Sequence, residues 1–115
     1  MAPIVVEKML EAPSSQTVRS RALSGKPARQ LRTEWTDAWE RDDCPGFLPM
    51  PMQFMLVSDA LNRIGRAQRR ELVGMPVGQV VGLMNEVHPV RDVMRRLVEE
   101  YVESVERLDT LNAQS

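Results

Sequence analysis

The stretch from Pro89 to Leu108 constrains the fold most, because apolar residues recur in it at steps of three and four. Its apolar positions are Val90, Val93, Met94, Leu97, Val98, Tyr101, Val102, Val105 and Leu108. This spacing places them on one face of an amphipathic α-helix, and Pro89 suits its beginning. The pattern therefore predicts a final helix that can pair with a partner through this face.

The rest of the chain also has mainly helical patterns. We expect helices over Ala2–Glu11, Ala28 to about Glu40, Met52–Ala67 and Val77–Met84. The stretch from Asp42 to Pro51 contains three prolines and a glycine, which predicts an irregular loop. Thr17–Leu23 alternates only weakly, as a short extended segment would. The sum is a mostly α chain with four or five helices and no dependable sheet.

Composition excludes several classes of function. A formal net charge of −1 gives no overall attraction to nucleic acid, and no apolar run approaches a membrane span of about 20 residues. The first residues lack the basic start of a signal peptide, so we expect a cytoplasmic protein. Cys44 and His88 are the single cysteine and histidine, which argues against a disulfide and against a thiolate or multi-histidine metal site.

The segment Met75–Leu83, MPVGQVVGL, holds two glycines four residues apart around Gln79. On a helix, Gly78 and Gly82 would share a face that another backbone or a flat ligand can approach closely. The Gln79 amide could then serve a polar heterocycle as donor and acceptor. The alternative is a tight contact between helices with Gln79 exposed, which such spacing more often reflects.

Other candidate residues are weaker. Arg19, Arg21, Lys26, Arg29 and Arg32 surround the Ser24-Gly25 turn and suit an anion, or else pair with Glu40, Asp42 and Asp43. His88 lacks a nucleophile at a recognisable spacing, and the acids beside Cys44 disfavour its thiolate. Met50, Met52 and Met55 suit a ligand pocket or ordinary packing. We therefore name no catalytic residue and no metal ligand.

Three segments resemble one known family. Arg21–Arg32, RALSGKPARQLR, resembles the R-x-x-[ST]-G-[KR]-P-A-R-x-L-R run of nitronate monooxygenases, also called 2-nitropropane dioxygenases. Gly46–Gln53, GFLPMPMQ, resembles their P-L-P-[MY]-P-L-Q loop, and Gly78–Leu83, GQVVGL, resembles their late G-Q-x-x-G-L. The order and spacing agree from about Val6 to Val105. The wider superfamily includes flavin-dependent enoyl-acyl carrier protein and quinone reductases.

The resemblance implies the helical C-terminal region of an FMN-binding (β/α)8 barrel enzyme, with the barrel strands largely absent. Residues 1–13 would be the last barrel helix, residues 14–111 the helical lid region and residues 112–115 a frayed tail. Gly78 and Gln79 would face the flavin, and Met50, Met52 and Gln53 would line the substrate pocket. Arg21, Lys26, Arg29 and Arg32 would be structural.

The implied reaction is oxidation of an alkyl nitronate by O₂ to a carbonyl compound and nitrite, with FMN as cofactor. Alternatives are a part of an enoyl-acyl carrier protein or quinone reductase, or a non-catalytic helical interaction module. The implied partner is a barrel polypeptide or a second copy of the chain. We expect the chain alone to be inactive and marginally stable, with Trp35, Phe47, Leu48 and Met55 exposed if it is a severed lid.

Overall fold

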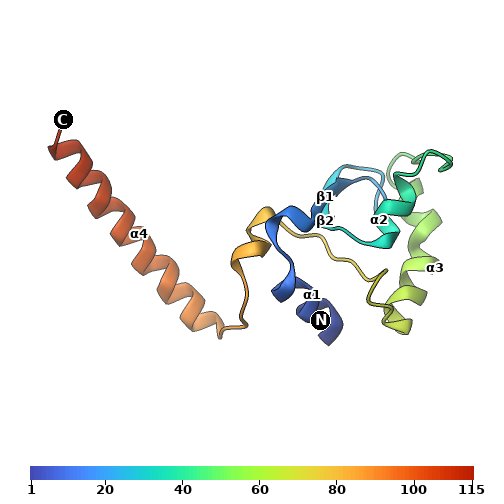
Figure 1. Ribbon diagram of the computed structural model, residues 1–115, viewed down its shortest axis with the longest axis horizontal. Helices are drawn as coiled ribbons and strands as arrows, with labels where there is room; N and C mark the ends of the chain where they lie inside the picture. The colour runs from blue at the N-terminus through green and yellow to red at the C-terminus, as the bar shows by residue number, and fades with distance from the viewer. The chain divides into compact units, whose positions relative to one another are not determined.

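Most residues of the chain lie in helices, as the spacing of its apolar residues predicts (Figure 1). The computed structural model describes residues 1–115, which divide into two units, Met1–Asn85 and Glu86–Ser115. The first unit contains α1 (Pro3–Glu11), η1 (Ser14–Gln16), β1 (Thr17–Ser20), β2 (Ala28–Leu31), α2 (Glu34–Trp39), α3 (Met52–Ala67) and η2 (Gln79–Leu83). The second contains α4 (Val90–Ala113).

A small antiparallel sheet replaces the beginning of one predicted helix. Strand β2 pairs with β1, with Thr17 opposite Leu31 and Ser20 opposite Ala28, so the helix predicted from Ala28 is wrong there. Helix α2 begins only at Glu34 because Thr33 caps it. The Thr33 hydroxyl accepts from the Thr36 backbone N–H at 3.3 Å, and the Thr36 hydroxyl accepts from the Thr33 N–H at 2.9 Å. This reciprocal cap satisfies backbone donors at the start of the helix.

The segment Met75–Val77 lies along the other edge of β2 and closes a small core. The Leu31 N–H donates to the Met75 carbonyl at 3.0 Å, and the Val77 N–H donates to the Arg29 carbonyl at 3.1 Å. Buried Ala12, Leu31 and Val81 form this core, and Met9, Met75 and Val77 pack against it. The core thus joins the end of α1, the sheet and η2 through small and aliphatic side chains.

Two predicted segments have the expected conformation. Helix α3 spans Met52–Ala67, the predicted range, and ends at Gln68 in a left-handed conformation with φ 48°. The stretch Asp42–Pro51 before it has neither helix nor strand. Both outcomes follow from sequence: prolines exclude regular structure from the loop, and apolar spacing identifies the helix.

The second unit is one long helix. Helix α4 begins at Val90 directly after Pro89, as predicted, and continues to Ala113. None of its residues is buried. The boundary between the two units falls after Asn85, within the expected segment 14–111. No helix of the chain combines the length and the hydropathy needed to cross a membrane.

Candidate functional site

The loop Gly46–Gln53 is held against the Ser24-Gly25 turn. Gly25 has φ +88°, and a Cβ built on it would lie 2.4 Å from the Leu48 carbonyl oxygen and 2.8 Å from the Met50 nitrogen. Only glycine permits this backbone conformation and this close approach together. Two of the three segments that resemble nitronate monooxygenases are therefore in direct contact.

The Gln53 side chain links the same two segments by hydrogen bonds. Its side chain is fully buried; Nε2 donates to the Ala22 carbonyl at 3.2 Å, and Oε1 accepts from the Leu48 N–H at 3.0 Å. A fully buried amide with both ends engaged cannot touch a ligand in this arrangement. The structure thus gives Gln53 a packing role that fixes the loop, and its place beside a substrate stays a prediction.

Met50 and Met52, the other residues predicted to line the substrate pocket, are exposed. Their exposed fractions are 51% and 50%, and Phe54, Met55 and Leu56 just beyond them are more than half exposed as well. So many exposed large apolar side chains within one short stretch are typical of a surface that another molecule covers.

Aromatic side chains fix the other side of the loop. Phe47 stacks on Trp39 at a ring-centroid distance of 5.6 Å, and Trp39 meets Trp35 edge-on at 6.0 Å. The Arg21 guanidinium lies 5.6 Å from the centre of the Phe47 ring, and its Nε donates to the Gly25 carbonyl at 2.7 Å. Because of this packing Phe47 and the tryptophans are only partly exposed, whereas Leu48 and Met55 are exposed at 41% and 66%.

The other basic residues near the turn also serve local contacts. Arg29 donates to the Thr17 hydroxyl at 3.0 Å, and Arg32 pairs with Asp37 at 2.9 Å. The predicted alternative of pairing with Glu40, Asp42 and Asp43 is not what the structure shows. Three of the five arginines and lysines are thus engaged within the first unit, which disfavours a common anion site.

Gly78 and Gln79 lie at the start of η2 rather than in an α-helix. The predicted helix over Val77–Met84 is therefore a short 3₁₀ turn, in which residues four apart do not share a face. Gly82 is the glycine that permits close packing: a Cβ on it would lie 2.3 Å from the Ser14 hydroxyl and 2.5 Å from the Ser14 nitrogen. The Ser14 hydroxyl donates to the Gln79 carbonyl at 2.6 Å.

The side chain of Gln79 remains free. Gln79 and Gly78 are both exposed, and the space beside Gly78 holds only Val80, at 3.7 Å or more. The segment thus contains both features weighed from the sequence: a tight contact at Gly82 and an exposed amide at Gln79. Which molecule meets that amide is not fixed by contacts within the chain.

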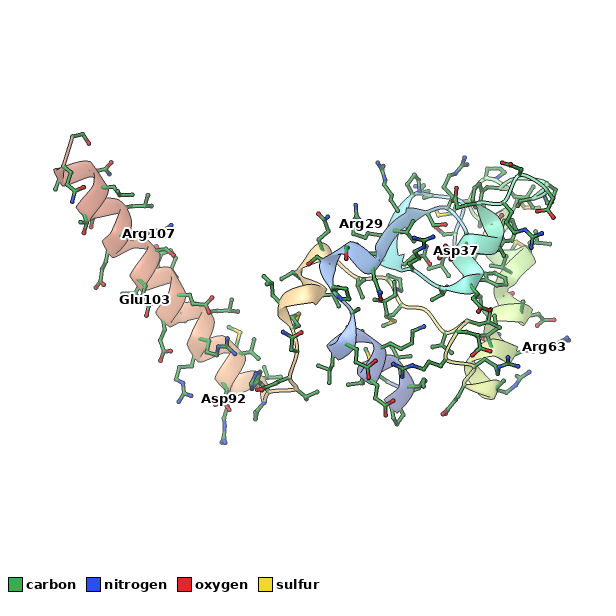
Figure 2. All side chains as sticks on the ribbon, viewed as in Figure 1. Arg29, Asp37, Arg63, Asp92, Glu103 and Arg107 are labelled. Atoms are coloured by element: carbon green, nitrogen blue, oxygen red, sulfur yellow. The ribbon has the colours of Figure 1, made fainter.

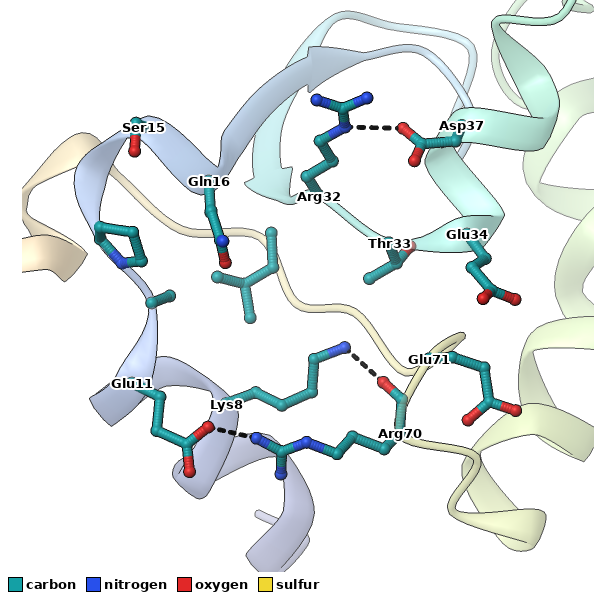
Figure 3. A pocket seen from close by; sticks show the side chains of 13 residues that line it. Lys8, Glu11, Ser15, Gln16, Arg32, Thr33, Glu34, Asp37, Arg70 and Glu71 are labelled. Carbon is teal, nitrogen blue, oxygen red and sulfur yellow. Dashed lines mark hydrogen bonds and ion pairs between the residues drawn. The ribbon is translucent and has the colours of Figure 1, made fainter.

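A hollow with charged walls lies elsewhere in the first unit (Figure 3). It is an open cavity of about 860 Å³, and none of the residues predicted to face the flavin or to line the substrate pocket lines it, whereas Arg32 of the basic cluster does. Its wall residues are Lys8, Glu11, Ala12, Pro13, Ser15, Gln16, Leu31, Arg32, Thr33, Glu34, Asp37, Arg70 and Glu71. In the sequence, this region is marked by the charged run Arg69–Glu71 after α3. Such a run alone does not predict a cavity.

The charges of this cavity are mostly neutralised within it. Lys8 donates to the backbone carbonyls of Arg70 at 2.6 Å and Val73 at 2.5 Å, and Arg70 pairs with Glu11. Desolvation by burial, followed by repulsion from Arg70, lowers the pKa of Lys8. The pKa of Glu71 is lowered by hydrogen bonding from its own backbone N–H and then from Arg69. These contacts bind α1 to the segment after α3 and leave few groups free for a ligand.

Catalytic and metal-binding groups do not converge in the chain. His88 lies 3.6 Å from Glu86, and Cys44 is a partly exposed free thiol. No three histidine, cysteine, aspartate or glutamate side chains lie close enough together to hold a metal ion. The arrangement can present an apolar surface and a free amide, but it contains no nucleophile with a positioned base.

A flavin ring needs apolar contacts and hydrogen bonds at its polar edge, and Met50, Met52 and Gln79 offer groups of these kinds. The structure does not bring them together, because α3 and η2 lie at opposite ends of the first unit (Figure 1). The phosphate of FMN is usually cradled by a glycine-rich turn between a strand and a helix. The connection from β2 to α2 contains no glycine, so it does not form such a turn.

Comparison with known proteins finds a relative that is much longer than this chain. The chain is 50% identical over 115 aligned positions to a Mycobacterium tuberculosis protein named "Putative monooxygenase Rv1533". The match covers 95% of this chain and 31% of that protein. No family model matches the chain, and no solved structure matches it. The chain is thus similar to less than one third of a protein that is named as a monooxygenase.

Proposed function

We propose that the chain is the helical C-terminal portion of an FMN-dependent oxidoreductase of the nitronate monooxygenase type. In this proposal it completes a flavin and substrate pocket whose barrel lies in a separate or longer polypeptide. The observation that carries the proposal is the 50% identity along almost the whole chain to one part of a longer monooxygenase-named protein. The three segments that resemble nitronate monooxygenases are the reason for proposing nitronate oxidation as the reaction.

Contacts within the first unit fix each of these segments in place. The Ser24-Gly25 turn and the Gly46–Gln53 loop fix each other through Gly25 and Gln53, and Gly82 fixes η2 against Ser14. These residues have structural tasks. Met50, Met52, Gly78 and Gln79 are among the family-like residues that remain exposed for contact with another molecule.

Each exposed group has a proposed task. FMN supplies the redox chemistry when it is bound in the complete enzyme. The Gln79 amide hydrogen-bonds a polar edge of the flavin or the nitro oxygens of the substrate, and Gly78 lets the ligand approach the backbone. Met50 and Met52 contact the alkyl part of the substrate and exclude water from it. No side chain of this chain is assigned as base.

A hybrid protein tests the proposal. This chain replaces the matching segment of the mycobacterial relative, and the purified hybrid is assayed for retained FMN and for nitrite released from propyl-2-nitronate. We expect the hybrid to retain FMN and to release nitrite with consumption of O₂. Gln79→Ala should weaken FMN retention or raise KM, whereas Gln114→Ala, an exposed glutamine after α4, should change neither.

Two results would contradict the proposal. A folded hybrid that retains no FMN would contradict the proposed flavin role. FMN retention without nitrite release would contradict the proposed nitronate specificity. NAD(P)H-dependent reduction of an enoyl thioester or a quinone by the same hybrid would favour the reductase alternative. The measured fluorescence of released FMN separates loss of cofactor from loss of turnover.

A second candidate function is a non-catalytic interaction module. The specific observation in its favour is α4, a helix of 24 residues without a buried position whose apolar residues are exposed along its length. Such a face is costly in water and indicates a protein partner. This candidate predicts association of the chain without any dependence on flavin.

A further inference from the structure

The hairpin formed by β1 and β2 carries an unbalanced positive charge. Between Glu11 and Glu34 the chain has no acidic residue, whereas it has five basic ones: Arg19, Arg21, Lys26, Arg29 and Arg32. Residues 12–33 therefore have a formal charge of +5, and the rest of the chain has −6 to give the net charge of −1. Such a concentration of one sign in one small element attracts anions even though the whole chain is nearly neutral.

Two of these residues face each other across the hairpin. Arg19 of β1 and Arg29 of β2 are direct partners in the antiparallel register. Residues directly opposite in such a pair have Cβ atoms about 4.5–5.5 Å apart on the same face of the sheet. Like charges in this position repel each other, so the arrangement lowers the stability of the hairpin unless an anion lies between them.

No acidic side chain of this protein neutralises the pair. None of the ion pairs in the structure includes Arg19 or Arg29. Arg19 is exposed and Arg29 is half-buried, so both can be reached by a small ion from solvent. Figure 2 labels Arg29 on the hairpin and, on α3, Arg63, which is a useful comparison because it is also an arginine without an ion pair.

Arg29 is held in place without being neutralised. Its Nη1 donates to the Thr17 hydroxyl at 3.0 Å, and that hydroxyl donates to the Ser14 carbonyl at 2.9 Å. This contact uses one of the five N–H groups of the guanidinium, and its acceptor is uncharged. The pair therefore keeps its charge and most of its donors. The contacts of Arg21 and Arg32 disfavour only a site shared by all five basic residues.

We propose that Arg19 and Arg29 form a binding site for a phosphate group, either inorganic phosphate or the phosphate of a small ester. A phosphate ester carries about 1.5 to 2 negative charges at pH 7, which matches two guanidinium groups. Its oxygens also suit the planar, paired N–H donors of arginine. The Thr17 hydroxyl positions Arg29 in advance, and the exposed Arg19 side chain closes on the bound group from the opposite strand.

An NMR titration of the ¹⁵N-labelled 115-residue chain with inorganic phosphate, at an ionic strength held constant with sodium chloride, tests the site. We expect saturable shifts of the Nε–H signals of Arg19 and Arg29. Arg19→Gln and Arg29→Gln should each weaken phosphate binding at least about fivefold. Arg63→Gln is the matched control and should leave binding unchanged. The same titration with glycerol 3-phosphate separates the two sources, because tighter binding than that of inorganic phosphate indicates an ester.

Urea unfolding separates a binding role of Arg19 from a structural one. Because Arg19 repels Arg29 in the free chain, Arg19→Gln without phosphate should raise the urea midpoint or leave it unchanged. Phosphate should raise the midpoint of the unsubstituted chain, and this rise should be smaller in Arg19→Gln.

Three results would overturn the inference. They are a titration without saturable shifts, a loss of binding in Arg63→Gln as large as in Arg19→Gln, and a lower urea midpoint for Arg19→Gln in the absence of phosphate. Neither readout involves flavin, so failure of this inference is separate from failure of the proposed function.

Discussion

Replacing Gln53 with methionine should destabilise the first unit strongly although the side chain keeps about the same size. Gln53 is fully buried, and its amide bonds the Ala22 carbonyl at 3.2 Å and the Leu48 N–H at 3.0 Å. Methionine leaves the buried Ala22 carbonyl without a partner, at a cost of about 1–3 kcal/mol. Leu48 is partly exposed, so its N–H can reach water and adds about 0.5 kcal/mol.

The expected total is a loss of about 1.5–3.5 kcal/mol in the free energy of unfolding, a large part of the stability of so small a unit. Urea unfolding followed by tryptophan fluorescence measures it, because Trp39 stacks on Phe47 in the same loop. Gln79→Met, at an exposed amide, is the control and should change stability by less than about 0.5 kcal/mol. If Gln53→Met and Gln79→Met unfold at the same urea concentration, the structural role assigned to Gln53 is wrong.

Two further predictions concern close packing and pH. Gly82→Ala should lower the free energy of unfolding by about 2 kcal/mol or more because its Cβ meets the Ser14 backbone, whereas Gly78→Ala has open space and should be nearly neutral; urea unfolding of both variants distinguishes them. The pKa of Glu71 is lowered, so its contribution to stability is complete above about pH 4.5 and is lost as pH falls through the lowered value. In a carboxyl NMR titration, Arg69→Gln should raise that pKa only in part, since the backbone N–H bond remains; an unchanged pKa would contradict the role of Arg69.

The helices could be predicted from sequence where the apolar pattern extended over many residues and where residues such as Pro89 marked its ends. Helix α3 ends at the predicted residues, and α4 begins after Pro89 as predicted. The error at Ala28–Leu31 has a physical cause. Leu31 fits a helical stripe with Trp35, but its backbone bonds both β1 and the distant segment at Met75. Such long-range pairing overrides local spacing and is not visible in a short window of sequence.

The sequence indicated which segments of the candidate site are important, but it did not predict the role of each residue in them. Gly82 and Gln53 belong to segments that the sequence analysis singled out, yet the structure gives them packing tasks. A fully buried glutamine and an exposed one look alike in sequence, because burial of Gln53 depends on carbonyls far along the chain. The charged cavity around Lys8 and Glu71 likewise arises from contacts between α1 and the segment after α3.

A flavin fluorescence titration tests the central proposal most directly. FMN is added to the purified 115-residue chain, and then to the chain mixed with the complementary segment of the mycobacterial relative, the part that this chain does not match. The account predicts no FMN binding by the chain alone and binding by the mixture, weakened by Gln79→Ala. FMN binding by the chain alone would show a self-contained flavin site and contradict the account, as would a folded mixture that binds none.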